Sequence, residues 1–418
     1  MNDNRHSWSE LAIDGGVPIR RAPMAPWPVF GDEDIAAVTA VLHSGRVNYW
    51  TGEETRKFEQ EFSAAVGCRY GVAVANGTVA LEAALAALEI GPGDDVLVTC
   101  RSFVASAACC VMRGARPVFA DVDPQSQNVT AETLEAVLTP RTRAIIAVHL
   151  AGWPCEMDAI DRLAIEHGLA VVEDCAQAHG ATYRGRPVGS LGDVAAFSFC
   201  QDKIMTTGGE GGMVVTNRED LWKRAWSLKD HGKDWDAAHR HDPAAVFKWL
   251  HQSVGTNWRM TEMQGVLGRF ALRRLPRWLA HRRRLAAHLQ SRLQTLPALR
   301  IASVPSHMEH AYYKYYAFLR PEYLRAGWSR DRIVKAIQAE GIPCGSGVCP
   351  EIYREQAFAG GTSCPPCRLP AASQLSETSL MFQVHPTLSP ADMDDTYRAV
   401  ERVLRVATQP VTSQRRAA

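Results

Sequence analysis

The sequence lacks several features that would decide its class at once. No apolar run reaches the roughly 18 residues that a transmembrane helix needs. The N-terminal MNDNRHSWSE is polar and has no apolar core of a secretory signal. Neither sign of charge predominates, because 46 basic and 45 acidic residues leave a formal net charge of +1. No field of the whole chain attracts nucleic acid or a membrane surface, and we expect neither as a partner.

A disulfide framework is missing as well. The eleven cysteines are an odd number. Many lie inside apolar segments, among them Cys100, Cys109, Cys110, Cys175 and Cys200. This distribution is typical of reduced, buried thiols and predicts a cytoplasmic protein. Cys364 and Cys367 bracket two prolines, but no second pair exists that would complete a zinc ribbon. We therefore expect bystander thiols there and no metal site.

The sequence does contain a long alternation of strand-like and helical segments. The apolar strand-like runs cover 70–76, 95–100, 116–122, 144–150, 169–175, 195–200 and 211–217. Near-continuous apolar strands separated by helices indicate an α/β fold with a mostly parallel sheet that is buried on both faces. Ligands of such sheets bind beyond the carboxyl ends of the strands, so the residues that follow each strand are the first candidates for a site.

A smaller unit follows, as a chain of 418 residues allows. After residue 217 the pattern loosens into loops rich in tryptophan and histidine up to about 256. The later elements that we predict are a long helix at 261–295, strands at 312–319 and 379–384, a helix near 329–340, and a helix from Pro390 capped by Ser389. The predicted division is a flexible N-terminus at 1–12, a large domain at 13–256, a connecting helix and small domain at 257–407, and a disordered tail at 408–418.

Several strand ends carry residues that suit a flat, anionic ligand. Strand 70–76 ends in an asparagine, and Gly77 and Thr78 then open a helix whose free backbone N–H groups suit a phosphate. Ser198 lies near the end of a second strand and can donate to the same group. Phe103 follows a third strand and becomes a stacking platform only if a flat ligand lies there. Each feature alone is common, since most such helix starts are simple caps and most such aromatics belong to the core.

A carboxylate and a lysine complete this set. Strand 169–175 is apolar until Glu173 and Asp174, and a buried carboxylate is costly unless a group pairs with it. An arginine or a helix N-terminus would be a structural partner. A protonated ring nitrogen would be a functional one, in a bond worth about 1.5–3 kcal/mol. Lys203 lies between a buried strand and a glycine-rich turn, where a lysine can become a nucleophile for a carbonyl. A phosphate cradle, an aromatic, a carboxylate and a lysine together are what pyridoxal phosphate (PLP) requires.

The motifs around these residues resemble those of a known family. Asp-Cys-Ala-Gln at 174–177, Ser-Phe-Cys-Gln-Asp-Lys at 198–203 and Gly-Glu-Gly-Gly at 209–212 are similar to those of the DegT/DnrJ/EryC1/StrS sugar aminotransferases. The resemblance extends over about residues 12 to 405. It implies a fold type I PLP-dependent transferase, with a large domain around a mostly parallel seven-stranded sheet and a smaller C-terminal α/β domain.

The resemblance also implies roles for single residues. Lys203 would bind the cofactor as a Schiff base, and Asp174 would pair with the pyridine nitrogen. Gln177 would lie near the ring hydroxyl, and Phe103 would stack on the ring. The implied phosphate contacts are Gly77, Thr78, Ser198 and, from the neighbouring subunit of a homodimer with shared sites, Asn257. The implied substrate contacts are Tyr49 and Thr51 in the loop 46–52, and His385. This loop departs from the family at Glu53, where a proline is common after the glycine.

The implied reaction moves an amino group from L-glutamate or L-glutamine to a keto sugar, most often a nucleotide-linked one. A keto-cyclitol acceptor and a reaction like that of 3-amino-5-hydroxybenzoate synthase remain alternatives within the same chemistry. The segment Phe-Cys-Gln-Asp-Lys at 199–203 differs from the glutamine-rich version of the cyclitol branch and favours the nucleotide sugar. A PLP-binding regulatory protein without turnover is the non-enzymatic alternative. The intact lysine, carboxylate and glycine-rich turn argue against it.

Overall fold

A seven-stranded sheet organises the first half of the chain in the computed structural model, which describes residues 10–240 and 249–409. Its spatial order is β1-β9-β8-β5-β4-β2-β3. These strands are β1 (Tyr70–Val74), β2 (Asp95–Thr99), β3 (Arg116–Ala120), β4 (Thr142–Val148), β5 (Ala170–Asp174), β8 (Val194–Ser198) and β9 (Gly212–Thr216). Only β9 runs against its neighbours in this sheet. The predicted mostly parallel sheet is thus confirmed.

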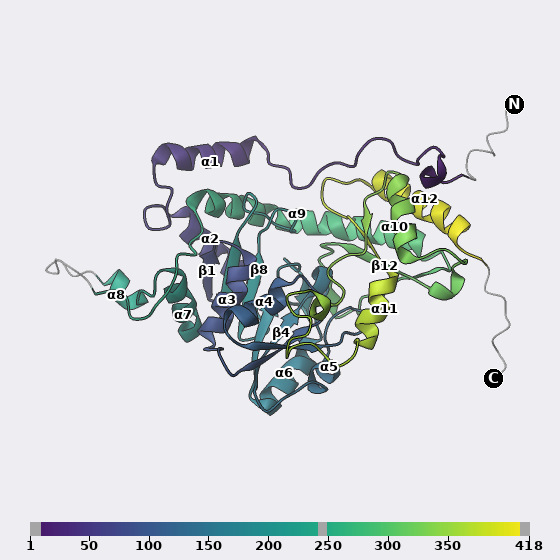
Figure 1. Cartoon of the computed structure of the whole chain (residues 1–418). Coiled ribbons are helices and arrows are strands. Elements are labelled where there is room, and N and C mark those ends of the chain that lie inside the picture. The colour runs from purple at the N-terminus through teal and green to yellow at the C-terminus, as the bar shows by residue number, and fades with distance from the viewer. Residues whose placement is uncertain (1–9, 241–248, 410–418) are drawn as a thin grey trace.

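Both faces of the sheet are buried, and in β1, β8 and β9 alternate residues enter different hydrophobic clusters. Val72 and Val214 pack on one face with the helices α3 (Gly77–Ala87) and α7 (Glu219–Lys229). Their neighbours in sequence, such as Ala73 and Met213, pack on the other face with α2 (Glu54–Val66). Further helices of this unit are α4 (Ala105–Met112), α5 (Ala131–Glu135) and α6 (Met157–His167). Figure 1 shows the helices on both sides of the sheet.

The second unit is built on a four-stranded antiparallel sheet in the order β10-β12-β14-β13. Its strands are β10 (Leu299–Arg300), β12 (Tyr315–Leu319), β13 (Cys344–Gly345) and β14 (Ser379–Phe382), and its helices are α10 (Arg330–Ala339), α11 (Pro370–Thr378) and α12 (Pro390–Ala407). As expected from the sequence, Ser389 caps α12, and its side chain accepts from the backbone N–H of Asp392. A small three-stranded sheet joins β6 (Thr182–Tyr183), β7 (Arg186–Pro187) and β11 (Met308–Glu309).

One long helix, α9 (Glu262–Leu293), belongs to both units. Thr261 forms a capping box with Gln264 at its start. Ala271 and Leu275 in its first half lie in a cluster with the large sheet. Leu285 and Leu289 in its second half lie in the core of the second unit. Figure 1 shows α9 running from the large sheet to α10 and α12.

The N-terminal segment also reaches both units. Leu11 lies in the core of the second unit. Arg402 of α12 donates to the carbonyl of Val17 at 2.7 Å and to Glu340 at 2.9 Å. The chain then runs on to α1 (Asp32–Ser44), which packs along α9. The predicted domain boundary at residue 13 stays a prediction, but residues just beyond it pack on the small unit. Residues 1–9 and 410–418, most of the predicted flexible ends, lie outside the described residues.

The expectation of loops between 218 and 256 is wrong for part of that stretch. α7 and the short α8 (Trp235–His239) lie there. Leu221, Ala225 and Trp226 are buried and follow helical spacing, because residues four apart share one face of a helix. Residues 241–248 lie outside the described residues. In the parts of the chain that the structure describes, no helix is long and apolar enough to cross a membrane.

Candidate active site

The start of α3 and the end of β8 meet at one edge of the large sheet. A Cβ atom added at Gly77 would lie 2.5 Å from Cβ and 2.9 Å from Oγ of Ser198, so no larger residue fits there. Asn76 caps the helix by accepting from the backbone N–H of Val79 at 3.1 Å. The structure therefore brings Gly77, Ser198 and the adjoining Thr78 together at a helix N-terminus. Such an arrangement of N–H and hydroxyl groups suits a phosphate.

Asp174 ends β5 and is almost fully buried. Its carboxylate accepts from Oγ of Ser106 at 2.7 Å and from the backbone N–H of Ala176 at 3.1 Å. Burial raises the pKa of Asp174, while the bond from Ser106 and the charge of Lys203 oppose this effect. A buried carboxylate of this kind is stabilised by a cation, and a protonated ring nitrogen supplies one. Ser106 escaped prediction because it lies inside α4 rather than at a strand end.

Lys203 lies in the turn after β8, with only 15% of its side chain exposed. Its Nζ donates to the hydroxyl of Tyr313 at 3.4 Å and lies 3.9 Å from the carboxylate of Asp202. Tyr313 in turn donates to Asp202, so the hydroxyl lies between the amine and the carboxylate. The N-terminal segment holds the backbone of this turn, because Nε1 of Trp27 donates to the carbonyl of Lys203 at 2.9 Å. The lysine is thus held in a nearly dry site, as its expected role requires.

Glu173 directly precedes Asp174, but its hydrogen bonds stabilise the fold and do not reach the candidate site. Its carboxylate accepts from the backbone N–H groups of Gly189, Leu191 and Gly192 and pairs with Nε2 of His149 at 3.0 Å. Burial acts to raise the pKa of Glu173, but the bonds from His149 and the backbone outweigh it and lower that pKa. Nδ1 of His149 accepts from the backbone N–H of Cys155, so both ring nitrogens are used. Although His149, Glu173 and Cys175 lie close enough to hold a metal ion, hydrogen bonds already satisfy the first two.

Three predicted cofactor contacts stay predictions. Gln177 is buried near the site, and its Oε1 accepts from the backbone N–H of Ala151 at 2.8 Å. Phe103 follows β2, and 62% of it is exposed, which leaves its ring free for a ligand or a second subunit. Asn257 is also exposed, in a segment that pairs with Asp230 through one antiparallel bridge. An exposed side chain here is compatible with a contact across a dimer.

The substrate role predicted for Tyr49 stays a prediction, although the structure encloses this side chain within the fold. Only 2% of Tyr49 is exposed, and its hydroxyl donates to Glu59 at 3.1 Å and accepts from Nε1 of Trp226 at 3.2 Å. The ammonium of Lys229 lies 3.8 Å from the centre of its ring. Both hydrogen-bonding roles of the hydroxyl are thus occupied inside the fold. Thr51 in the same loop is exposed and donates to the carbonyl of Asn48 at 3.1 Å, so its substrate role stays a prediction.

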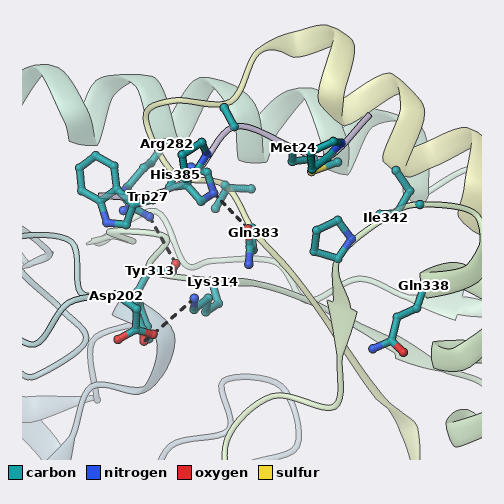
Figure 2. A pocket seen from close by; sticks show the side chains of 16 residues that line it. Met24, Trp27, Asp202, Arg282, Tyr313, Lys314, Gln338, Ile342, Gln383 and His385 are labelled. Carbon is teal, nitrogen blue, oxygen red and sulfur yellow. Dashed lines mark hydrogen bonds and ion pairs between the residues drawn. The ribbon is translucent and has the colours of Figure 1, made fainter. Parts of the chain in front are cut away.

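His385 lines a cleft of about 530 Å³ beside the Lys203 turn. Figure 2 shows its ring over the cleft, next to Trp27 from the N-terminal segment and above Asp202 and Lys314. Its ring nitrogens bond Gln383 at 3.0 Å and Thr387 at 2.8 Å. Burial and the charges of Arg282 and Lys314 lower the pKa of His385 to about 4, so the imidazole is neutral at pH 7. Its predicted role towards the substrate stays a prediction.

The combination of a lysine amine, a buried carboxylate and a phosphate cradle at the strand ends fits a PLP enzyme. Residues 28–401 match the model of the DegT/DnrJ/EryC1/StrS aminotransferase family. The chain belongs to this family of PLP-dependent aminotransferases.

Similar proteins include curated sequences and solved structures. The chain is 35% identical to the UDP-N-acetyl-3-dehydro-alpha-D-glucosamine 3-aminotransferase of Acidithiobacillus ferrooxidans, over 93% of this chain and 95% of that protein. It is also 35% identical to the spore coat polysaccharide biosynthesis protein SpsC of Bacillus subtilis, over 91% of this chain and 96% of that protein. The X-ray structure of an aminotransferase from Psychrobacter cryohalolentis matches with a TM-score of 0.90 at 50% identity, over 92% of this chain and 100% of that one.

Proposed function

We propose that this aminotransferase moves an amino group from L-glutamate or L-glutamine to a nucleotide-linked keto sugar. The observation that carries the proposal is a largely buried lysine, Lys203, whose charge acts on a buried carboxylate, Asp174, next to a phosphate cradle. The similarity to an enzyme whose name specifies a UDP-linked 3-dehydro sugar supports the choice of acceptor. The structure of a 3-amino-5-hydroxybenzoic acid synthase also matches, but at a lower identity of 27%, and the choice of acceptor below tests this alternative and the keto-cyclitol one.

Each residue of the candidate site has a separate role in this reaction. Lys203 would hold PLP through its amine, and the cofactor would supply the electron sink for cleavage of a C–H bond on the donor. The amine of Lys203 would act as base and acid towards the donor's α-carbon. Asp174 would pair with the ring nitrogen, and Gly77, Thr78 and Ser198 would hold the phosphate. The low exposure of Lys203, 15% of its side chain, limits the access of water to this amine.

A homodimer with shared sites is part of the proposal. Asn257 and Thr51 are exposed, which suits residues that complete the site of a neighbouring subunit. The reaction is assigned to the cytoplasm, since all eleven cysteines are free thiols and seven of the nine before residue 350 are buried, as a reducing compartment allows.

The proposal is tested with purified protein, PLP and a set of keto acceptors. We expect absorbance from lysine-bound cofactor, release of 2-oxoglutarate from L-glutamate beyond one equivalent per site only when a keto sugar nucleotide is present, and loss of both signals in Lys203→Ala. A regulatory protein would bind PLP but release no 2-oxoglutarate with any acceptor. Turnover with scyllo-inosose alone would instead establish the cyclitol alternative.

A further inference from the structure

The cleft beside Lys203 carries more positive than negative charge. Three charged side chains line it among the described residues: Asp202, Arg282 and Lys314. The Nζ atom of Lys314 lies 3.6 Å from the carboxylate of Asp202, and 18% of the Lys314 side chain is exposed. Lys203 adds a further amine on the other side of Asp202. One carboxylate therefore faces two amines, and the same cleft also holds the guanidinium of Arg282.

Arg282 is the most unusual of these groups. It projects from α9, is almost fully buried, and donates through one nitrogen to the carbonyls of Tyr312 and Tyr313 at 3.2 and 3.3 Å. Its Nε and Nη2 atoms have no hydrogen-bond partner among the described residues. Burial lowers the pKa of Arg282 to about 9, which still leaves the guanidinium charged at pH 7. A buried cation with unsatisfied donors is costly and is stabilised by an anion nearby.

The placement of the two cations decides their roles. The Arg282 guanidinium lies in the wall of the cleft, 5.5 Å from the indole ring of Trp27, and only 1% of Arg282 is exposed. Lys314 instead points into the cleft, opposite His385 and Gln383 (Figure 2). Lys314 can therefore touch a ligand, whereas the buried Arg282 strengthens the positive potential from within the wall.

We propose that this cleft binds an anionic oxygen group of a substrate, a carboxylate or a phosphate, with Lys314 as its contact and Arg282 as the buried charge behind it. The inference rests on the proposed function, because both a dicarboxylate donor and a nucleotide-linked acceptor carry such groups. On the opposite wall His385 bonds Oε1 of Gln383, and the amide nitrogen of Gln383 adds an uncharged donor. The cleft thus provides specificity next to the reacting lysine.

The test measures binding rather than turnover. Glutarate stands for the carboxylates of the donor and UDP for the diphosphate of the acceptor, and each is titrated by calorimetry into the PLP-loaded protein. Loading with PLP occupies the phosphate cradle at α3, so that anions do not bind there instead. The variants are Lys314→Gln, which removes the contacting charge, and Asp202→Asn, which removes the competing carboxylate. Lys335→Gln is the matched control, since Lys335 is an exposed lysine of α10 outside the cleft.

We expect Lys314→Gln to weaken one of the two ligands at least ten-fold, Asp202→Asn to strengthen the same ligand, and Lys335→Gln to change neither. A loss confined to glutarate assigns the cleft to the donor, and a loss confined to UDP assigns it to the acceptor. Unchanged binding of both ligands in Lys314→Gln would overturn the inference. Equal weakening by Lys314→Gln and Asp202→Asn would overturn it too, because the loss would then follow from disturbed packing.

The same titrations separate this inference from the proposed function. If the wild type releases no 2-oxoglutarate with any acceptor while its anion binding depends on Lys314, the proposed function fails and the anion site stands. If turnover is normal and anion binding is unchanged in Lys314→Gln, only the proposal of the anion site fails. The variant Arg282→Lys, which keeps a charge, should retain more of the affinity than Arg282→Met, provided that both unfold as cooperatively as the wild type.

Discussion

Replacing Glu59 with glutamine should destabilise the large unit by leaving a buried charge without its partner. Nζ of Lys229 is fully buried and donates to Glu59 at 2.9 Å. The same carboxylate accepts from the backbone N–H of Ala73 at 2.8 Å and from Tyr49. Two unit charges at this separation attract by about 6 kcal/mol at an effective dielectric constant near 20, and desolvation offsets much of that. Removing one partner of such a pair costs about 3–5 kcal/mol.

The assay is urea unfolding followed by circular dichroism, at fixed saturating PLP because a bound ligand raises the apparent stability. Glu53→Gln is the matched control, since its ion pair with Lys57 has the same length of 2.9 Å but is exposed, and we expect almost no change. The double variant Glu59→Gln/Lys229→Met should be more stable than Glu59→Gln alone, because no unpaired charge remains. A loss below about 1 kcal/mol in Glu59→Gln, or a double variant less stable than the single one, would refute the reasoning.

Three further predictions concern the site. Asp174→Asn should retain PLP but lower the rate of transamination roughly 10- to 150-fold, the kinetic equivalent of about 1.5–3 kcal/mol; near-normal turnover would contradict its electronic role. Tyr49→Phe should lower the free energy of unfolding by about 1 kcal/mol and leave KM for both substrates unchanged, whereas a raised KM would support the substrate role. Mixing inactive Lys203→Ala and Asn257→Ala subunits should recover about one quarter of the wild-type activity, because half of the dimers then hold one complete site; no recovery would count against shared sites.

The sequence predicted the sheet and the groups at its strand ends because both depend on local patterns. Continuous apolar runs identified the strands, and the rule for ligand sites in parallel sheets directed attention to Gly77, Asp174, Ser198 and Lys203. α7 was missed because its tryptophans and lysines resemble a loop in composition, although Leu221, Ala225 and Trp226 follow helical spacing. Composition outweighed periodicity in that prediction, and periodicity was the better guide.

The contacts that were missed join residues far apart in the chain. Tyr313 lies 110 residues after Lys203 and comes from the segment that leads into the second unit. Tyr49 looked like a loop residue available to a substrate, but it is enclosed by Glu59 and by Lys229, and these two are themselves 170 residues apart. Propensity and motif describe neighbours in sequence, so a partner brought in by tertiary packing leaves no local signal.

The long helix α9 has a consequence for attempts to cut the molecule into pieces. Its first half supplies Ala271 and Leu275 to one core, and its second half supplies Leu285 and Leu289 to the other. The N-terminal segment also connects the two units, because Leu11 packs in the core of the second unit while Trp27 donates to the carbonyl of Lys203 in the large unit. A fragment ending near residue 256 would lose the helix that covers its sheet, and a fragment starting there would lose its N-terminal cover. Each would expose apolar surface, so neither half should serve as a stable, separately expressed module.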